Sequence, residues 1–249
     1  MGLAGRAGQV NADSLIPTLR EFYGLLPQPP SDPFQFFIWE ILSADALPAR
    51  RDIAWLALRR LPALTPDAMA RTPTKDLAEV MRLIGPQPDE RIERIRAATS
   101  EMKRHRDLFD PDALRSKGLR FAARAFRRLS QLPRDVVDRA LLYAAGYPVL
   151  PLDDGAARVI ARIEGTAIAP SHGAEGFTLK RALYAGQLRK QRRRARKTLA
   201  SLLPCDVDVY RDAVLYLRHH AHNTCLAVAP HCKVCPLLPE CAFGRQHAS

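Results

Sequence analysis

The sequence is notable first for several features that it lacks. Its 249 residues contain no apolar run of about eighteen residues or more, so no segment is long and apolar enough to span a membrane. The first ten residues, MGLAGRAGQV, lack the long apolar core of a secretory signal peptide. Few segments alternate apolar and polar residues as half-buried strands do, and no internal repeat is present. We therefore expect a cytoplasmic protein with little or no β-sheet.

Helical periodicity is abundant. In the segment DSLIPTLREFYGLL, Leu15, Ile16 and Leu19 recur at three- and four-residue spacing, and in DERIERIRAATSEMKRH, Ile92 and Ile95 do the same. The 20 prolines are compatible with many short helices joined by tight turns. These patterns predict an all-α fold.

Acidic residues are too few to balance the basic ones: 38 Lys and Arg face 26 Asp and Glu, which gives a net charge of +12. Such an excess attracts polyanions, nucleic acid first, and an anionic membrane surface would also fit, so the charge indicates a class of partner and no more. The charge is densest in the segment LRKQRRRARK, for which a solvated helix face is the simpler interpretation. Because no acid compensates the run, we expect it to contact phosphates. Its cations are Arg189, Lys190, Arg192, Arg193, Arg194, Arg196 and Lys197.

Four of the five cysteines lie near the end of the sequence, with the spacing C-x6-C-x2-C-x5-C. They are Cys225, Cys232, Cys235 and Cys241. In a reducing compartment such a cluster indicates a metal site before a disulfide. Four thiolates can hold either tetrahedral zinc or a cubane iron–sulfur cluster, and the spacing does not separate the two. Cys205 stands apart, and we expect it to be an ordinary buried thiol.

The cysteine spacing closely resembles the [4Fe-4S] loop of the endonuclease III family, the helix-hairpin-helix DNA glycosylases of base excision repair. Residues 132–162 resemble the hairpin and catalytic-aspartate segment of that family, and residues 32–48 resemble its early barrel helix. Residues 1–12 and about 165–200 match poorly. The resemblance therefore covers most of the chain.

The resemblance implies two helical domains that flank a DNA-binding groove. Residues 26–146 would form a six-helix barrel with a divergent helix-hairpin-helix, and residues 1–25 and 147–249 would form a discontinuous iron–sulfur domain. A structural [4Fe-4S] cluster would be the cofactor, and it would shape a DNA-facing basic loop that carries Lys233. The partner would be double-stranded DNA, bound by a monomer that is associated with the nucleoid.

By the same resemblance, Asp153 in PLDDGAARV matches the catalytic aspartate of the family. It would stabilise an oxocarbenium-like sugar or activate water. Asp154 would be the equivalent residue if the register shifts by one position. The simpler interpretation is a helix N-cap before GAARVIARI, and a cap and a catalytic role are compatible.

Glu40 lies in the otherwise apolar segment FFIWEIL and matches the pocket glutamate of the mismatch adenine glycosylases and related thymine mismatch glycosylases. Burial would raise the pKa of this side chain and make it a suitable general acid. The alternative is a glutamate on the solvated side of its helix.

Several positions depart from the family pattern. The family hairpin reads LPGVG, and its glycines let backbone amides approach a phosphate; here the hairpin reads LPRDV, with Arg134 and Asp135 in place of that chemistry. Asp135 would repel phosphate, and the charge of Arg134 would substitute in part. Asp138 occupies the position of the lysine that forms a Schiff base in bifunctional relatives, which predicts that lysine-dependent lyase activity is absent. Asp45 occupies the position of a glutamine that fills the gap left by a flipped base. Asp138 and Asp45 are thus candidate pocket residues.

Three hypotheses follow from these residues. The first is a monofunctional DNA N-glycosylase that uses Asp153 and Glu40 to remove a damaged or mismatched base. The second is a DNA-binding paralogue on the same fold that has lost catalysis, which the altered hairpin, Asp138 and Asp45 favour. The third is a zinc-bound nucleic-acid module without glycosylase ancestry.

Overall fold

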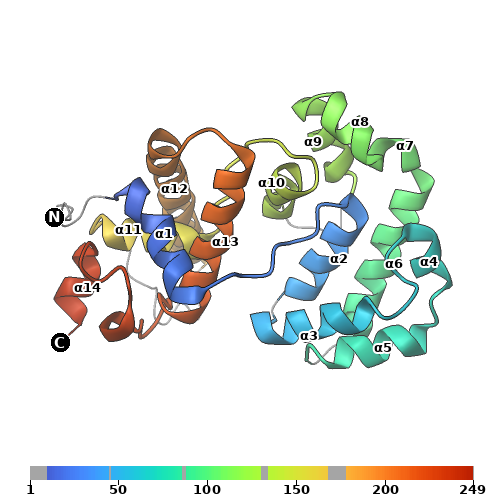
Figure 1. Ribbon diagram of the computed structural model, residues 1–249, viewed down its shortest axis with the longest axis horizontal. Coiled ribbons are helices and arrows are strands. Elements are labelled where there is room, and N and C mark those ends of the chain that lie inside the picture. The colour runs from blue at the N-terminus through green and yellow to red at the C-terminus, as the bar shows by residue number, and fades with distance from the viewer. Residues whose placement is uncertain (1–9, 45, 86–87, 130–133, 168–177, 249) are drawn as a thin grey trace. The chain divides into compact units, whose positions relative to one another are not determined.

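The computed structural model describes residues 10–44, 46–85, 88–129, 134–167 and 178–248 (Figure 1). The described residues form α-helices and one short 3-10 helix, and they contain no strand. The predicted all-α fold is therefore confirmed. None of the described helices combines the length and the apolar character that a membrane span requires.

The chain divides into two compact units. Residues 29–149 form one unit, which we call the contiguous unit. Residues 1–28 and 150–249 together form the other, which we call the discontinuous unit. The chain therefore leaves the discontinuous unit after its first helix and returns to it near residue 150.

The contiguous unit contains nine described helices. They are α2 (Pro33–Ser43), α3 (Pro48–Leu58), α4 (Pro66–Arg71), α5 (Thr74–Arg82), α6 (Pro88–Arg104), α7 (Arg106–Phe109), α8 (Pro111–Ser116), α9 (Leu119–Arg127) and α10 (Arg134–Tyr143). Proline at the first turn marks the start of several of them, where its missing N–H leaves no hydrogen bond unmade. Helix α2 begins behind Asp32, whose carboxylate accepts a hydrogen bond from the backbone N–H of Gln35 at 2.9 Å.

Helix α2 lies at the centre of this unit. Its side chains are buried almost all round, and it packs against α3, α6 and α10. Aromatic rings fill the space between these helices: Phe37 contacts Phe126 of α9 edge to face, and Phe36 stacks on Tyr143 of α10. A helix that is apolar on every side is a core helix, so any ionisable residue on α2 is placed in the interior.

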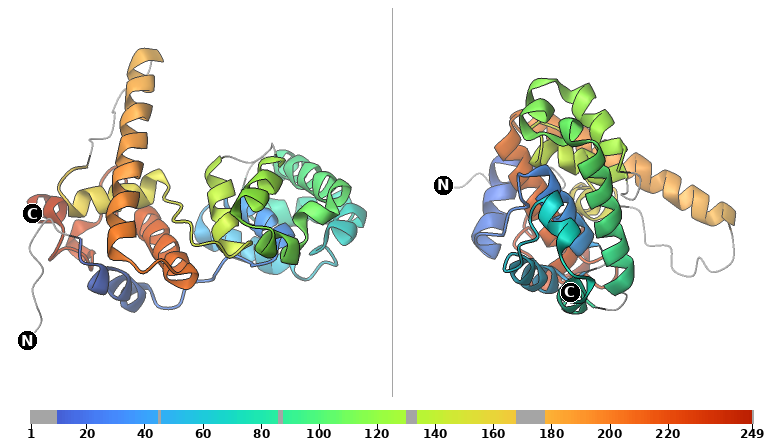
Figure 2. Two further views of the ribbon diagram at one scale, coloured as in Figure 1. Left: turned by 90° about the horizontal axis from the view of Figure 1, so that it is seen from above. Right: turned by 90° about the vertical axis from the view of Figure 1, so that its right-hand side faces the viewer.

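The described part of the discontinuous unit contains α1 (Ala12–Tyr23), α11 (Asp154–Ile163), α12 (Thr178–Leu202), α13 (Val207–Asn223), the 3-10 helix η1 (Cys232–Val234) and α14 (Ala242–His247). Helix α11 packs against α12, α13 and α14, and it is the core of this unit. The first turns of α12 extend beyond the other helices of the unit (Figure 2).

Helix α1 is attached to the C-terminal half of the chain through α13. Leu15 and Leu19 of α1 are buried, Arg20 forms a salt bridge with Asp212, and the hydroxyl of Tyr216 donates a hydrogen bond to the carbonyl of Gly24 at 2.9 Å. These contacts explain why the first 28 residues belong to the same unit as residues 150–249.

Candidate functional site

Glu40 lies in the middle of α2 and is only 5% exposed. Its two carboxylate oxygens both accept hydrogen bonds from Nε of Arg139 at 3.1 Å, and Oε2 also accepts one from Nη2 at 2.5 Å. Arg139 is on α10, and its Nη1 donates to Oδ2 of Asp135 at 2.8 Å. The carboxylate is therefore in the interior of the contiguous unit and is paired with a guanidinium.

The Arg139 partner of Glu40 was not predicted from the sequence. Burial lowers the pKa of Arg139, but the charges and hydrogen bonds of Glu40 and Asp135 outweigh it, so the pKa is raised and the guanidinium stays charged. The guanidinium and the carboxylate are thus joined by charge-assisted hydrogen bonds. Glu40 is buried, as its apolar surroundings indicated, and both of its oxygens accept hydrogen bonds from the Arg139 guanidinium.

Asp153 is the N-cap of α11. Its Oδ1 accepts a hydrogen bond from the backbone N–H of Ala156 at 2.8 Å, and its Oδ2 accepts one from Nε of Arg218 on α13 at 3.0 Å. The side chain is 21% exposed, so the carboxylate is fixed in position and still reaches solvent. The sequence did not identify Arg218 as the partner of this residue.

Gly155 allows α11 to start so close to α13. A Cβ atom at this position would lie 3.0 Å from Cβ of Ala221 and 3.3 Å from Oδ1 of Asp153. A larger side chain would push the start of α11 away from α13, on which Arg218 is located. The glycine after the aspartate pair is therefore part of what positions Asp153.

Asp154 is the first residue of α11 and lies in different surroundings. Its side chain is 45% exposed, and its Oδ1 forms an ion pair with Nε of Arg192 on α12 at 3.3 Å. Of the two adjacent aspartates, Asp153 is thus held by a backbone amide and a guanidinium, and Asp154 forms an ion pair with the basic segment.

The remaining candidate pocket residues are described in part. Asp138 is on α10 and lines an open groove beside α9. Asp45 and the hairpin positions 130–133 lie outside the described residues. Arg134 begins α10, but its side chain also lies outside what the structure describes.

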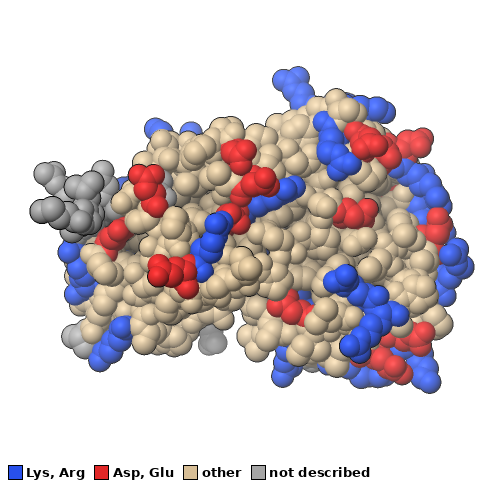
Figure 3. Space-filling model, viewed as in Figure 1, with Lys and Arg blue, Asp and Glu red and all other residues tan. Residues whose placement is uncertain are grey.

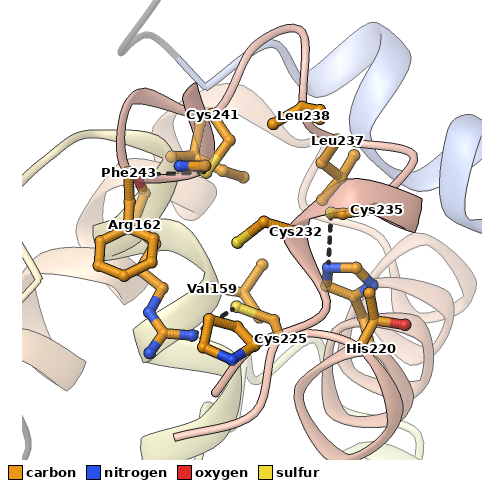
Figure 4. A pocket seen from close by; sticks show the side chains of 14 residues that line it. Val159, Arg162, His220, Cys225, Cys232, Cys235, Leu237, Leu238, Cys241 and Phe243 are labelled. Atoms are coloured by element: carbon orange, nitrogen blue, oxygen red, sulfur yellow. Dashed lines mark hydrogen bonds between the residues drawn. The ribbon is translucent and has the colours of Figure 1, made fainter. Parts of the chain in front are cut away.

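All four clustered cysteines line one cavity of about 20 Å³, formed by α11, α13, η1, α14 and their connections (Figure 4). Nitrogen atoms approach three of the sulfurs. Arg162 Nη1 is 3.2 Å from Sγ of Cys225, the backbone N of Gly244 is 3.2 Å from Sγ of Cys241, and Nε2 of His220 is 3.6 Å from Sγ of Cys235. Cys205 is exposed in the connection between α12 and α13, so our expectation of a buried thiol was wrong.

The chemistry of the four cysteines is compatible with their being the ligands of an iron–sulfur cluster. Burial raises the pKa of Cys235 to about 11 and also raises the pKa values of Cys232 and Cys241. Thiolates so close together need a strong positive centre, and N–H donors directed at sulfur are typical of iron–sulfur sites. Within the described ranges, no three or more His, Cys, Asp or Glu side chains are arranged to hold a single metal ion.

Two arginines of α11 hold the loop that carries Cys225. Arg158 donates to the carbonyl oxygens of Ala221 and Cys225, both at 3.0 Å from Nη2. Arg162, which is 4% exposed, donates to the carbonyls of Leu226 at 2.6 Å and Ala227 at 3.0 Å. We had not singled out either residue from the sequence. The signal was there: Arg162 falls on the apolar face of the helix GAARVIARI, where an arginine needs partners.

The basic segment lies on α12, and some of its cations are paired. Arg192 pairs with Asp154, and Nε of Arg194 lies 3.1 Å from Oε2 of Glu164. The exposed members are Arg189, Lys190, Arg193, Arg194, Arg196 and Lys197, and Lys233 on η1 is also exposed. On the face drawn in Figure 3, basic side chains lie among acidic ones. Whether a given cation is available to contact an anion therefore depends on its acidic neighbours.

Comparison with solved structures shows the endonuclease III fold. A trapped covalent intermediate of endonuclease III with DNA, in an estranged-adenine complex, matches with a TM-score of 0.60 at 16% identity, over 97% of this chain and 100% of that one. A non-covalent endonuclease III–DNA complex matches with a TM-score of 0.59 at 18% identity, over 96% and 99%.

A thermostable thymine-DNA glycosylase matches with a TM-score of 0.60 at 17% identity, over 94% of this chain and 97% of that one. No protein-family model and no curated protein matches the sequence. The resemblance that the motifs indicated is thus confirmed for the fold.

Proposed function

We propose that this endonuclease III-like chain is a monofunctional DNA N-glycosylase that removes a damaged or mismatched base from duplex DNA. The observation that carries the proposal is Asp153, a partly exposed carboxylate fixed at the start of α11 by Ala156 and Arg218. The fold supports it, because the similar structures are endonuclease III–DNA complexes and a thymine-DNA glycosylase.

The reaction requires a negative charge near the sugar. A glycosylase takes the target nucleotide out of the duplex, and cleavage of the N-glycosidic bond then develops positive charge on the sugar. In our proposal the carboxylate of Asp153 stabilises that charge or activates the attacking water. Asp138 occupies the position at which bifunctional relatives have lysine, and a carboxylate cannot form an imine. The proposed enzyme therefore has no lysine-dependent AP lyase activity.

Glu40 has a supporting role in this proposal. Because both of its oxygens accept hydrogen bonds from Arg139, Glu40 in this proposal does not supply the proton for the departing base; it holds Arg139 and α10 in place beside Asp138. The preferred substrates are then bases that leave without prior protonation. A cationic alkylated purine leaves as a neutral base, and a uracil leaves as a delocalised anion. Both classes satisfy this condition.

We further propose that Cys225, Cys232, Cys235 and Cys241 hold a [4Fe-4S] cluster. Bound there, the cluster would cross-link the C-terminal loop and would take no part in bond cleavage. Purified protein should contain iron and labile sulfide in equal amounts and absorb visible light. Zinc without sulfide would instead support a zinc-bound nucleic-acid module.

The proposed partner is double-stranded DNA, which the protein binds as a monomer. Arg134, the exposed cations of α12 and Lys233 are the proposed phosphate contacts. Arg192 and Arg194 contribute less in this account, because acidic residues already neutralise part of their charge.

A panel of lesion and mismatch duplexes, each assayed for abasic sites, tests the proposed activity. We expect at least one duplex to yield abasic sites that become strand breaks only after alkali treatment. The competing hypothesis is a DNA-binding paralogue without catalysis, which Asp135 and Asp138 favour. Salt-dependent binding to every duplex, without excision from any, would establish that alternative.

A further inference from the structure

Helix α9 carries an arginine face that the sequence analysis did not single out. Arg120, Arg124 and Arg127 are spaced four and three residues apart, which places them on one side of the helix, and all three are exposed. The opposite side carries Ala122 and Phe126, which are buried in the core of the contiguous unit. The helix therefore has one face that packs inward and one that presents guanidinium groups.

These three arginines line a groove next to a candidate pocket residue. The groove has a volume of about 650 Å³ and is open to solvent, and its other wall is formed by α10, with Asp138 and Leu141. By the sequence resemblance, Asp138 corresponds to the lysine that carries out covalent chemistry in bifunctional relatives. The arginine face thus lies on the same groove as a position that our account already connects with the reaction.

None of the three arginines forms a hydrogen bond or salt bridge with another residue of the described ranges. Arg128, the next residue along the chain, differs: its Nε lies 3.6 Å from Oε1 of Glu101, and its Nη2 lies 3.2 Å from Nε2 of His105. Like charges one helical turn apart repel one another. An anionic partner in the groove would relieve this repulsion.

The spacing of the charges fits an extended polyanion. Arg120 and Arg127 are seven residues apart, about 10 Å along the helix axis at a rise of about 1.5 Å per residue. Three successive phosphates of one DNA strand are separated by two steps, about 7 Å along the duplex axis at roughly 3.4 Å per nucleotide, a length that the long arginine side chains can cover. A row of this length matches successive phosphates of a strand better than it matches one small anion.

We propose that the α9 arginine face, Arg120, Arg124 and Arg127, binds the phosphodiester backbone of duplex DNA along the groove that contains Asp138. The segment after α9 reads LPRDV and has no glycine through which backbone amides could closely approach a phosphate. Side-chain guanidinium groups supply that contact instead. The inference rests on the part of the proposed function that makes duplex DNA the partner, and it does not depend on base excision.

The test is the salt dependence of binding to an undamaged duplex oligonucleotide. In the full-length triple variant Arg120→Gln/Arg124→Gln/Arg127→Gln, the slope of log K against log salt should fall in magnitude by about 2.7, at about 0.9 per phosphate contact. Affinity at about 0.1 M salt should fall roughly 10²–10³-fold. The lysine triple variant at the same positions should keep most of the slope.

A matched control removes the same charge elsewhere in the contiguous unit. Arg104, Arg106 and Arg115 are exposed and paired with Glu101, Asp67 and Asp112. Their triple glutamine variant should keep the wild-type slope to within about 0.9, the change expected for one phosphate contact. Helical circular dichroism and thermal unfolding of every variant verify that each one is folded.

The outcomes separate this inference from the proposed enzyme. An unchanged slope in the α9 variant, or an equal loss in the control variant, would overturn the inference. A preference of more than tenfold for an RNA duplex of the same sequence would overturn the assignment to DNA. The predicted change in slope without any base excision would uphold the arginine face while the glycosylase proposal fails.

Discussion

Glu40 and Asp153, one in each unit, are both bound by an arginine, but their surroundings differ. The Glu40 side chain is 3% exposed, and Arg139 donates to both of its oxygens from two nitrogens. Asp153 is 21% exposed and accepts one hydrogen bond from Arg218 and one from a backbone amide. Glu40 is thus part of the core, whereas Asp153 has a fixed position and remains accessible.

The difference separates a structural charge from one that is available for chemistry. A buried ion pair contributes little net stability compared with apolar residues, but loss of one partner leaves an uncompensated charge in the interior. A partly exposed pair is screened by water, and loss of its arginine has a small effect. Stability should therefore respond strongly to changes around Glu40, and excision should respond most to changes at Asp153.

The largest effect on stability is expected for Arg139→Ala. This variant leaves the Glu40 carboxylate buried without its guanidinium, so the free energy of unfolding should fall by about 3–5 kcal/mol in urea titrations. The double variant Glu40→Leu/Arg139→Met, which removes both charges, should recover most of that loss. If the double variant is as unstable as Arg139→Ala alone, the unpaired Glu40 charge is not the cause of the stability loss.

A smaller effect, on rate rather than stability, is expected for Glu40→Gln. The amide keeps the size of the side chain but weakens its hold on Arg139, so positioning in the pocket is disturbed and excision slows by up to about 10²-fold. Single-turnover rates and DNA affinity should be measured together, because the affinity should change by less than about twofold. An unchanged rate would remove Glu40 from the proposed site.

The corresponding substitution at the Asp153 pair, Arg218→Gln, should have a modest effect on stability. The pair that it breaks is partly exposed, with side-chain exposures of 28% for Arg218 and 21% for Asp153, so the free energy of unfolding should change by less than about 1 kcal/mol. Thermal and urea unfolding provide the measurement. A loss as large as that of Arg139→Ala would contradict the contrast between the two pairs.

The smallest effect is expected for Asp154→Asn. Its side chain is 45% exposed and its ion pair with Arg192 is partly solvated, so stability should stay within about 0.5 kcal/mol of wild type. The excision rate should also be unchanged. A loss of excision in this variant would indicate that Asp154, not Asp153, is the catalytic residue.

Local patterns predicted much of this fold. The three- and four-residue spacing of apolar side chains, the proline helix starts and the short cysteine spacing all act within one or two turns of chain. Glu40 was recognisable as a buried acid because α2 is apolar on every side. The placement of Cys205 was predicted wrongly, because a cysteine by itself does not indicate whether its turn lies at the surface.

The partners of the charged side chains were not predictable in the same way. Arg139 lies 99 positions after Glu40, and Arg218 lies 65 positions after Asp153, so neither pair leaves a local pattern. For the α9 arginines, the sequence did not indicate that acidic partners are missing within the described ranges. In the sequence they look the same as the paired Arg128, and only the packed structure separates arginines that have acidic partners from those that have none among the described residues.

The most direct test of the account compares single-turnover base excision by wild-type protein and Asp153→Asn on the best duplex of the panel. We predict that the wild-type protein produces abasic sites that break only in alkali. In Asp153→Asn the rate should fall by about 10²-fold or more while salt-dependent DNA binding is retained. An undiminished rate in Asp153→Asn, or strand breaks by the wild-type protein without alkali, would contradict the proposed chemistry.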